Sequence, residues 1–228
     1  MIPLKDDVRS NSFPFVNVLL ILANIIVFSV EIRSPSPQVL EHFINQWALF
    51  PGPLLSNPWG NGYRVISSMF LHAGWLHIIG NMLYLWVFGD NIEDRVGHLR
   101  YLFFYLLVGA GAALTQSYMN SSSTIPMLGA SGAIAGVMGA YFVLYPRARV
   151  TVAFPIFIFI KFIEIPAILL LGFWFIFQAL QGYGSLVNLA AGAKDLGGVA
   201  WWAHAGGFLA GVLLIFIFRK SRKRRSFF

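Results

Sequence analysis

The chain of 228 residues contains no cysteine and few charged residues. Without cysteine, a disulfide, a thiolate metal site and a cysteine nucleophile are all excluded. Charged residues make up 11% of the chain, whereas soluble domains have roughly one quarter, so an ordinary water-soluble globule is also excluded. Hydrophobic residues make up 57%, which is too apolar for a disordered chain. We therefore expect a multi-pass, all-α integral membrane protein with one membrane domain.

Five apolar runs are clear and are taken as expected membrane spans: residues 13–32, 75–89, 99–119, 131–145 and 201–218. No small-residue cleavage site follows the first run directly, so we expect a retained helix rather than a removed signal. As one helix, residues 150–181 would be about 48 Å long, which exceeds a hydrocarbon core of about 30 Å. Because Pro155 and Pro166 break this stretch, we expect an interfacial segment at 150–164 and the fifth of six spans at 165–181.

The distribution of basic residues predicts the orientation of these six spans. Most lysine and arginine residues lie inside when both termini are cytoplasmic, as the positive-inside rule requires. The predicted parts are a cytoplasmic segment at 1–12, a six-span domain at 13–218 with a large external loop at 33–74, and a basic cytoplasmic tail at 219–228. The tail is either simply solvated or bound to anionic lipid. We therefore expect membrane lipid, and not nucleic acid, as a partner.

Three polar residues share one depth in this topology. Counted back from the charged inner ends of their helices, Ser131, His204 and His77 lie roughly 20 to 24 Å above the inner boundary. Asn81 follows His77 by one helical turn on the same face. Polar groups inside a membrane are costly and mark functional sites, so this layer is the candidate site.

Small residues on the fourth and sixth spans favour a close approach of Ser131 and His204. Gly132 and Gly136 form one Gly-x-x-x-Gly pair, and Gly207 and Gly211 form another. A serine such as Ser131 in a run of small residues is more often a packing residue, but His204 at the same depth favours a catalytic role for it. The serine opens its helix, where free backbone N–H groups can stabilise an oxyanion, and His204 is the candidate general base.

Several motifs together resemble the rhomboid family of intramembrane serine proteases. They are Gly129-x-Ser131-Gly132, Ala203-His204-x-x-Gly207-x-x-x-Gly211, His72-x4-His77-x3-Asn81 and Tyr63-Arg64. The resemblance implies a six-transmembrane-helix bundle, in which Ser131 is the nucleophile and His204 the base. It also implies that Asn81 and His77 surround the oxyanion and that Arg64 is structural.

Two departures from the family pattern affect this interpretation. Tyr63 stands where a tryptophan often precedes the arginine, and Ala135 stands where some members stack a tyrosine on the histidine. The second departure leaves open what orients His204. In rhomboid-like proteins the gap between the second and fifth helices is the proposed substrate gate, so Trp174 and Phe175 are candidate gate residues. A lipid-facing aromatic band is the alternative for them.

The leading hypothesis is a serine endopeptidase that cleaves transmembrane protein substrates near their external ends, without a cofactor. A catalytically silent rhomboid-like binding protein is the first alternative, and a small transporter or channel is the second. No His-Glu-x-x-His motif is present, and His72 and His77 do not align on one helix face, so we expect no metal site. The expected location is the plasma membrane of a prokaryote.

Overall fold

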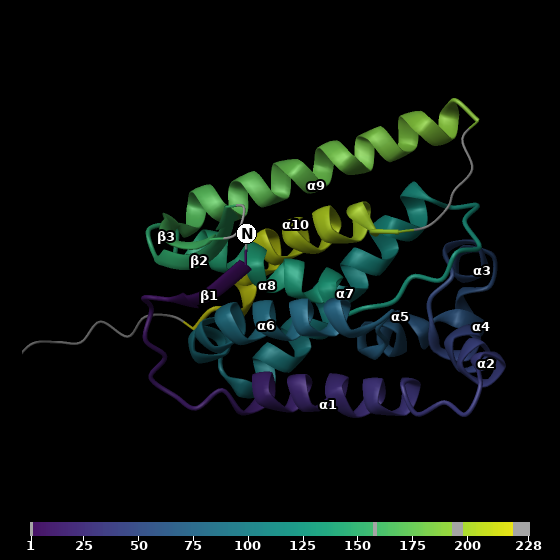
Figure 1. The fold of residues 1–228 in the computed structure, drawn as a ribbon, viewed down its shortest axis with the longest axis horizontal. Helices are drawn as coiled ribbons and strands as arrows, with labels where there is room; N and C mark the ends of the chain where they lie inside the picture. Colours follow the sequence, from purple (N-terminus) through teal and green to yellow (C-terminus); the bar gives the residue numbers. More distant parts are fainter. Residues whose placement is uncertain (1, 157–158, 193–197, 221–228) are drawn as a thin grey trace, which may run out of the picture.

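The computed structural model describes residues 2–156, 159–192 and 198–220. The four predicted basic residues at 222–225 of the tail therefore lie outside the described residues. Most of the described chain is helical, and it begins with a short strand (Figure 1). In chain order the elements are β1 (Ile2–Asp6), α1 (Phe15–Glu31), α2 (Pro37–Trp47), α3 (Pro51–Ser56), α4 (Pro58–Asn61), α5 (Arg64–Ser67), the 3-10 turn η1 (Ser68–Phe70), α6 (Trp75–Val96), α7 (His98–Met119), α8 (Ser131–Leu144), β2 (Arg149–Ile156), β3 (Phe159–Pro166), α9 (Ala167–Ala190) and α10 (Trp201–Phe218).

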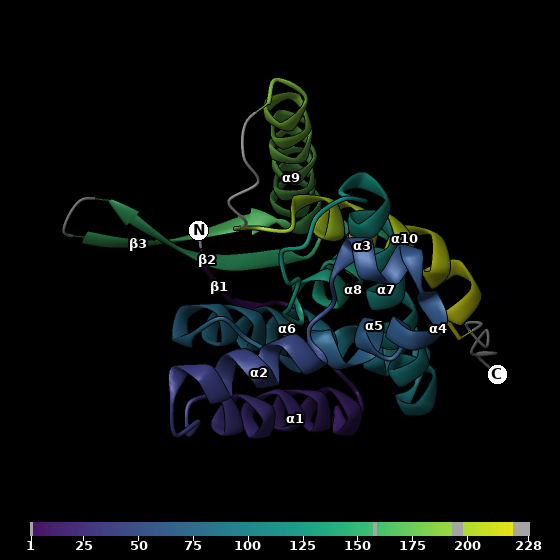
Figure 2. The same ribbon diagram turned by 90° about the vertical axis from the view of Figure 1, so that its right-hand side faces the viewer.

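The six long helices correspond to the six apolar runs expected from the sequence, and α8 lies among them. It packs against α6, α7, α9 and α10, while α1 packs against α6 on one side of the bundle and α9 lies on the other (Figures 1 and 2). Every residue from Gly132 to Tyr141 of α8 is buried, so this helix forms the core.

By length and composition, three helices in the described part of the chain can cross a membrane: α7, α9 and α10. Helices α1 and α8 are apolar but shorter. Helix α6 ends in a charged turn that contains Asp90, Glu93, Asp94 and Arg95. The chain is thus a mostly helical membrane protein, and the count of six spans stays a prediction.

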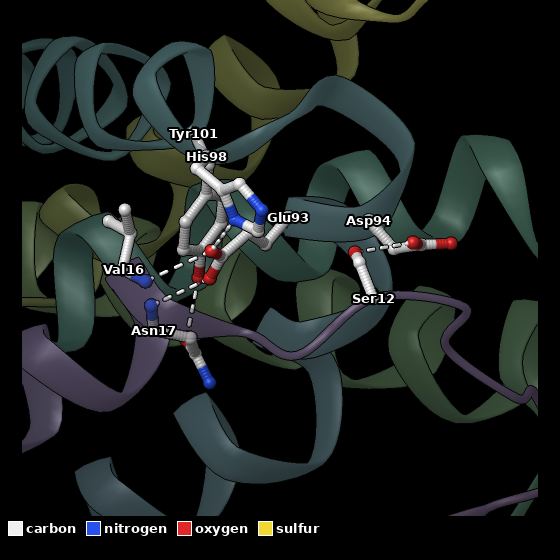
Figure 3. A network of polar contacts seen from close by, with 7 residues as sticks. All are labelled: Ser12, Val16, Asn17, Glu93, Asp94, His98 and Tyr101. Carbon is white, nitrogen blue, oxygen red and sulfur yellow. Dashed lines mark hydrogen bonds and ion pairs between the residues drawn. The ribbon is translucent and has the colours of Figure 1, made fainter.

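A buried carboxylate, Glu93, links helix α6 to the N-terminus of α1. The Glu93 side chain accepts hydrogen bonds from the backbone N–H groups of Val16 (2.9 Å) and Asn17 (2.7 Å) in the first turn of α1 (Figure 3). His98 Nδ1 lies 2.5 Å from the same carboxylate, and the Tyr101 hydroxyl donates to Asn17 Oδ1 at 2.8 Å. A negative charge at a helix N-terminus satisfies N–H groups that have no partner inside the helix. This network therefore stabilises the end of the bundle farthest from Ser131.

The expectation of an all-α protein is wrong for residues 150–164. They form most of β2 and β3, an antiparallel hairpin that projects sideways from the helices (Figure 2). Strand β1 adds to β2, with Asp6 opposite Val150. The Asp6 carboxylate accepts hydrogen bonds from Tyr141 of α8 and from Asn91 of α6, which ties the sheet to the helices. The segment predicted to be interfacial is thus built from two paired strands, and its position at the interface stays a prediction.

The predicted external segment, residues 33–74, contains α2 to α5 and η1. Arg64 holds it together, since its guanidinium donates to the carbonyl oxygens of Asn45 (2.7 Å) and Ala48 (3.1 Å). A backbone bridge between Leu49 and Met127 attaches the segment to the loop that precedes Ser131. These contacts agree with the structural role expected for Arg64, which stays a prediction.

Candidate active site

Ser131 is the first residue of α8, and the glycine two residues earlier shapes its approach. Gly129 has φ = +122°, a left-handed conformation that residues with a side chain rarely adopt. A Cβ atom there would lie 2.7 Å from the imidazole of His77, so the backbone also passes too close to α6 for any side chain. The Gly129 N–H donates to the Ser68 carbonyl oxygen at 2.8 Å, which fixes the turn.

His204 lies in the first turn of α10 and reaches the serine directly. The distance from His204 Nε2 to Ser131 Oγ is 2.8 Å, which is a hydrogen bond of ordinary length. The structure thus brings together the two residues that the sequence placed at one depth on different helices. A serine hydroxyl in contact with an imidazole nitrogen is the arrangement that nucleophilic catalysis requires.

Glycine contacts between α8 and α10 permit this approach. A Cβ added to Gly207 would overlap the carbonyl oxygen of Gly132, and one added to Gly211 would overlap that of Gly136. The two Gly-x-x-x-Gly pairs therefore face each other across the same interface. Any larger residue at Gly207 or Gly211 would push the helices apart and separate Ser131 from His204.

The other imidazole nitrogen of His204 contacts a residue that the sequence analysis did not identify. Gln178 of α9 places its Oε1 2.8 Å from His204 Nδ1, and its side chain is 5% exposed. Trp174, one turn earlier on α9, packs against the imidazole with ring centroids 5.8 Å apart. The available signal was a glutamine inside the apolar run at 165–181, because a polar residue at that depth needs a partner.

Three polar side chains lie near the serine on the α6 side. Asn81 Nδ2 is 3.0 Å from His72 Nε2, which leaves the second N–H of that amide free to donate elsewhere. The Ala73 N–H donates to His77 Nδ1 at 3.4 Å, so neutral His77 carries its proton on Nε2. Burial, with a smaller contribution from His77, lowers the pKa of His72 to about 4. His72 is thus a neutral acceptor for Asn81 at neutral pH.

A cavity of about 700 Å³ joins these groups. Ser131, His204, His77 and Asn81 all line it, together with Trp174. Its walls come from α6 on one side and from α9 and α10 on the other. The cavity can therefore hold a peptide segment between the serine and the α6 side chains.

The two candidate gate residues lie differently on α9. Trp174 faces the cavity and His204, whereas Phe175 stacks on Phe208 of α10 with ring centroids 4.9 Å apart and planes 24° apart. Phe175 is therefore a contact between α9 and α10. No group of three or more histidine, cysteine or acidic side chains forms a metal site among residues 2–156, 159–192 and 198–220.

Comparison with known proteins gives a family match over most of the chain. The model of the Rhomboid domain matches residues 60–221. Rhomboid-like protein 11, chloroplastic, of Arabidopsis thaliana is 28% identical over 165 residues, which cover 69% of this chain and 53% of that protein. Rhomboid protein 1, mitochondrial, of Saccharomyces cerevisiae is 30% identical over 153 residues, which cover 65% of this chain and 40% of that protein. Rhomboid protease GluP of Bacillus subtilis is 36% identical over 81 residues, or 36% of this chain and 15% of that protein.

The relatives are named for different cellular locations. The matched regions cover about half or less of each relative, and the names include chloroplastic and mitochondrial proteins as well as a bacterial one. The expected plasma membrane of a prokaryote is therefore not supported, while a membrane location is. Since the model of the Rhomboid domain matches well over half of its residues, this chain belongs to the rhomboid family.

Proposed function

We propose that this chain is an intramembrane serine endopeptidase that cleaves transmembrane segments of other membrane proteins near their external ends. The hydrogen bond of 2.8 Å between Ser131 Oγ and His204 Nε2 is the observation that carries the proposal. Membership of the rhomboid family supports it. The names of the relatives give no substrate that could be transferred to this chain.

In the first step, His204 Nε2 takes the proton of Ser131 while Oγ attacks the carbonyl carbon of the scissile peptide bond. The negative charge that forms on the carbonyl oxygen is stabilised by the Ser131 backbone N–H, by Asn81 Nδ2 and by His77 Nε2. The C–N bond then breaks, and His204 returns its proton to the leaving amine. An acyl group remains on Ser131.

Water completes the reaction. His204 takes a proton from a water molecule in the cavity, and the resulting hydroxide attacks the acyl carbon. The bond to Ser131 Oγ breaks, the serine recovers a proton from His204, and the acid product leaves. Both half-reactions use the His204 imidazole, so its orientation affects the rate of acylation and the rate of deacylation.

We propose the six-span topology for the six long helices, with both ends of the described chain in the cytoplasm and the β-sheet at the inner interface. Helix α8 has 14 residues, or about 21 Å, which is shorter than a core of about 30 Å. If its inner end lies at the inner boundary, Ser131 lies within the membrane and below its outer surface. A cut near the external end of a substrate helix follows from this depth.

We propose that substrate enters between α6 and α9. The cavity lies between these helices, with Gly80 and Tyr84 on the α6 wall and Trp174 on the α9 wall. Helix α9 is buried at only four residues, namely Ala167, Leu171, Gln178 and Gly182. A helix held by so few buried side chains can move more easily than α8.

Labelling of the purified protein with a fluorophosphonate probe tests the function. The probe is expected to modify wild-type protein and not Ser131→Ala. A catalytically silent binding protein, or a transporter or channel, would give no labelling that depends on Ser131. Absence of labelling, together with failure to cleave any transmembrane substrate in proteoliposomes, would contradict the proposal.

A further inference from the structure

We propose that Gln178 is a positioning residue for His204: its amide oxygen accepts the Nδ1–H and so holds the imidazole in the tautomer whose Nε2 can take the proton of Ser131. The inference rests on the proposed protease function and deepens it. It supplies the orienting group for a histidine that has no carboxylate partner.

The hydrogen-bond pattern favours this tautomer over the other. A neutral imidazole carries one proton, so one of its nitrogens donates and the other accepts. In the described part of the chain, Ser131 Oγ has a single hydrogen-bond partner, His204 Nε2. For the serine hydroxyl to donate within the protein, Nε2 must accept, and the proton must lie on Nδ1. Gln178 Oε1, 2.8 Å away, is then the acceptor that Nδ1–H requires.

Packing on both sides holds the Gln178 side chain in place. Trp174 and Gly182 lie one turn before and one turn after it, on the same face of α9. Trp174 packs on the imidazole, and Gly182 is so close to Trp202 of α10 that an added Cβ would be 3.0 Å from the indole. Close contacts between α9 and α10 thus lie one turn before and one turn after Gln178, and Gln178 itself is buried, which limits the orientations open to its amide.

Helix α8 offers no substitute for this contact. The residue one turn after Ser131 is Ala135, whose methyl group can neither accept a proton nor stack on a ring. Apart from the hydrogen bond to Ser131, the described contacts of the His204 ring, one polar and one aromatic, both come from α9. Loss of the Gln178 acceptor should therefore release the imidazole to sample the unproductive tautomer.

Three variants of the full chain separate positioning from packing. Gln178→Leu keeps the approximate volume but removes the acceptor, Gln178→Glu keeps an acceptor oxygen, and Gln181→Leu makes the same change at an exposed position of the same helix. Each is assayed for fluorophosphonate labelling of Ser131 across pH and for kcat and KM with a transmembrane substrate.

Gln178→Leu should lower the labelling rate and kcat about 10- to 100-fold and leave KM unchanged. This loss is a part of the rate enhancement that a general base usually contributes, because the base is still present but no longer held in one orientation. Gln178→Glu should recover most of this rate and move the pH midpoint upward, because a carboxylate stabilises the imidazolium. His77 is the other titratable group that faces His204 in the described chain, and it is unchanged in all variants. Gln181→Leu should behave as wild type. Equal losses in Gln178→Leu and Gln178→Glu would show that only packing matters and would overturn the proposal.

A second readout does not depend on proteolysis. In the 15N NMR spectrum of specifically labelled protein above the pH midpoint, the His204 signals, assigned by their absence in His204→Gln, should show the proton on Nδ1. Gln178→Leu should shift them towards a mixture of tautomers. A wild-type proton on Nε2 would overturn the positioning role even if Ser131 is reactive. Failure of the protease proposal would instead appear as absence of Ser131 labelling in the wild-type protein.

Discussion

The α8–α10 pair and helix α9 both contribute to the same site, but they are held in different ways. Helix α8 is buried continuously from Gly132 to Tyr141, and glycines bring its backbone against that of α10. Helix α9 is longer, yet only four of its 24 residues are buried in the isolated chain, and Phe173, Ile176 and Leu180 are exposed. The reacting groups thus come from the closely packed pair, while the residues around the imidazole come from the loosely packed helix.

We infer from this difference that the α8–α10 pair and helix α9 determine different properties of the site. The distance between Ser131 and His204 is set by backbone contacts that cannot relax without separating the helices. The orientation of His204 is set by side chains on a helix that can move relative to the pair. A substrate that displaces α9 would then change the orientation of the base before it changes its distance from the nucleophile.

The largest effect is expected from removing the reacting groups of the rigid pair. Ser131→Ala and His204→Ala should each lower proteolysis by at least about 10⁴-fold, because each removes a member of the nucleophile and base pair. Thermal unfolding in detergent should stay close to wild type, since alanine is tolerated in apolar packing. Cleavage of a transmembrane substrate in proteoliposomes is the measurement, and near wild-type activity of Ser131→Ala would contradict the assignment.

A smaller effect is expected from Asn81 of α6, which in the proposed mechanism is one of three oxyanion donors. Asn81→Ala should lower kcat by at most about 10²- to 10³-fold, because the Ser131 backbone N–H and His77 remain. His72→Gln is the matched control, since glutamine can still accept a hydrogen bond from Asn81 but cannot titrate. Unchanged kcat in Asn81→Ala would remove Asn81 from the oxyanion site.

Glycine variants test whether the α8–α10 pair is packed more closely than α9. Gly211→Ala should destabilise the fold by about 1–3 kcal/mol, since the added methyl group overlaps the Gly136 carbonyl. Gly184→Ala on α9 meets nothing within 4 Å and should leave stability unchanged or raise it by about 0.5–1 kcal/mol. Denaturant unfolding in mixed micelles compares the two. Similar destabilisation by both variants would mean that α9 is packed as closely as α10.

Loosening α9 should affect large substrates more than small ones. Phe175→Ala removes the stack on Phe208 and should raise cleavage of a transmembrane substrate by about 2- to 5-fold, as expected when a gating motion limits turnover. Fluorophosphonate labelling should change by less than about twofold, because a small probe enters from water. Phe173→Ala, at an exposed position of α9, is the control. Equal changes in both assays would mean that Phe175 supports the fold rather than a gate.

The smallest effect concerns acid stability. The pKa of His72 is lowered from 6.5 to about 4 by burial, so between these values the unfolded chain binds a proton that the folded protein does not. This group therefore lowers the stability as the pH falls from about 6.5 to about 4. His72→Gln removes the effect, so its melting temperature should fall less than that of wild type over this window. Parallel melting curves for the two proteins would contradict the burial of a neutral His72.

The positions of the six long helices could be predicted because apolar runs report burial in lipid or protein. The run at 201–218 matches α10, but the fifth run ends at residue 181 whereas α9 continues to Ala190. The hairpin is not predicted, because Pro155 and Pro166 indicate breaks in a helix. The β-branched residues from Val150 to Val152 are a local signal for a strand. The pairing of β1 with β2 joins residues far apart in sequence and therefore leaves no local signal.

Part of the site could be predicted, because the position of a residue along its helix can be counted from the sequence. Depth alone could suggest Ser131 with His204, because both lie near the N-terminal ends of their helices. It could not identify Gln178, since the side that a glutamine faces depends on the rotation and tilt of α9. The contact of His72 with Asn81 was hidden for a similar reason, because His72 precedes α6 and only the turn at Ala73 and Gly74 brings it back over the helix.

The central claim is that Ser131 is the nucleophile and that His204 activates it. The most direct measurement is mass spectrometry of the protein after fluorophosphonate treatment, which locates the covalent adduct by residue. The account predicts one adduct, on Ser131, in wild-type protein and a strongly reduced yield of the same adduct in His204→Ala. An adduct on another serine, or an equal yield on Ser131 in His204→Ala, would contradict it.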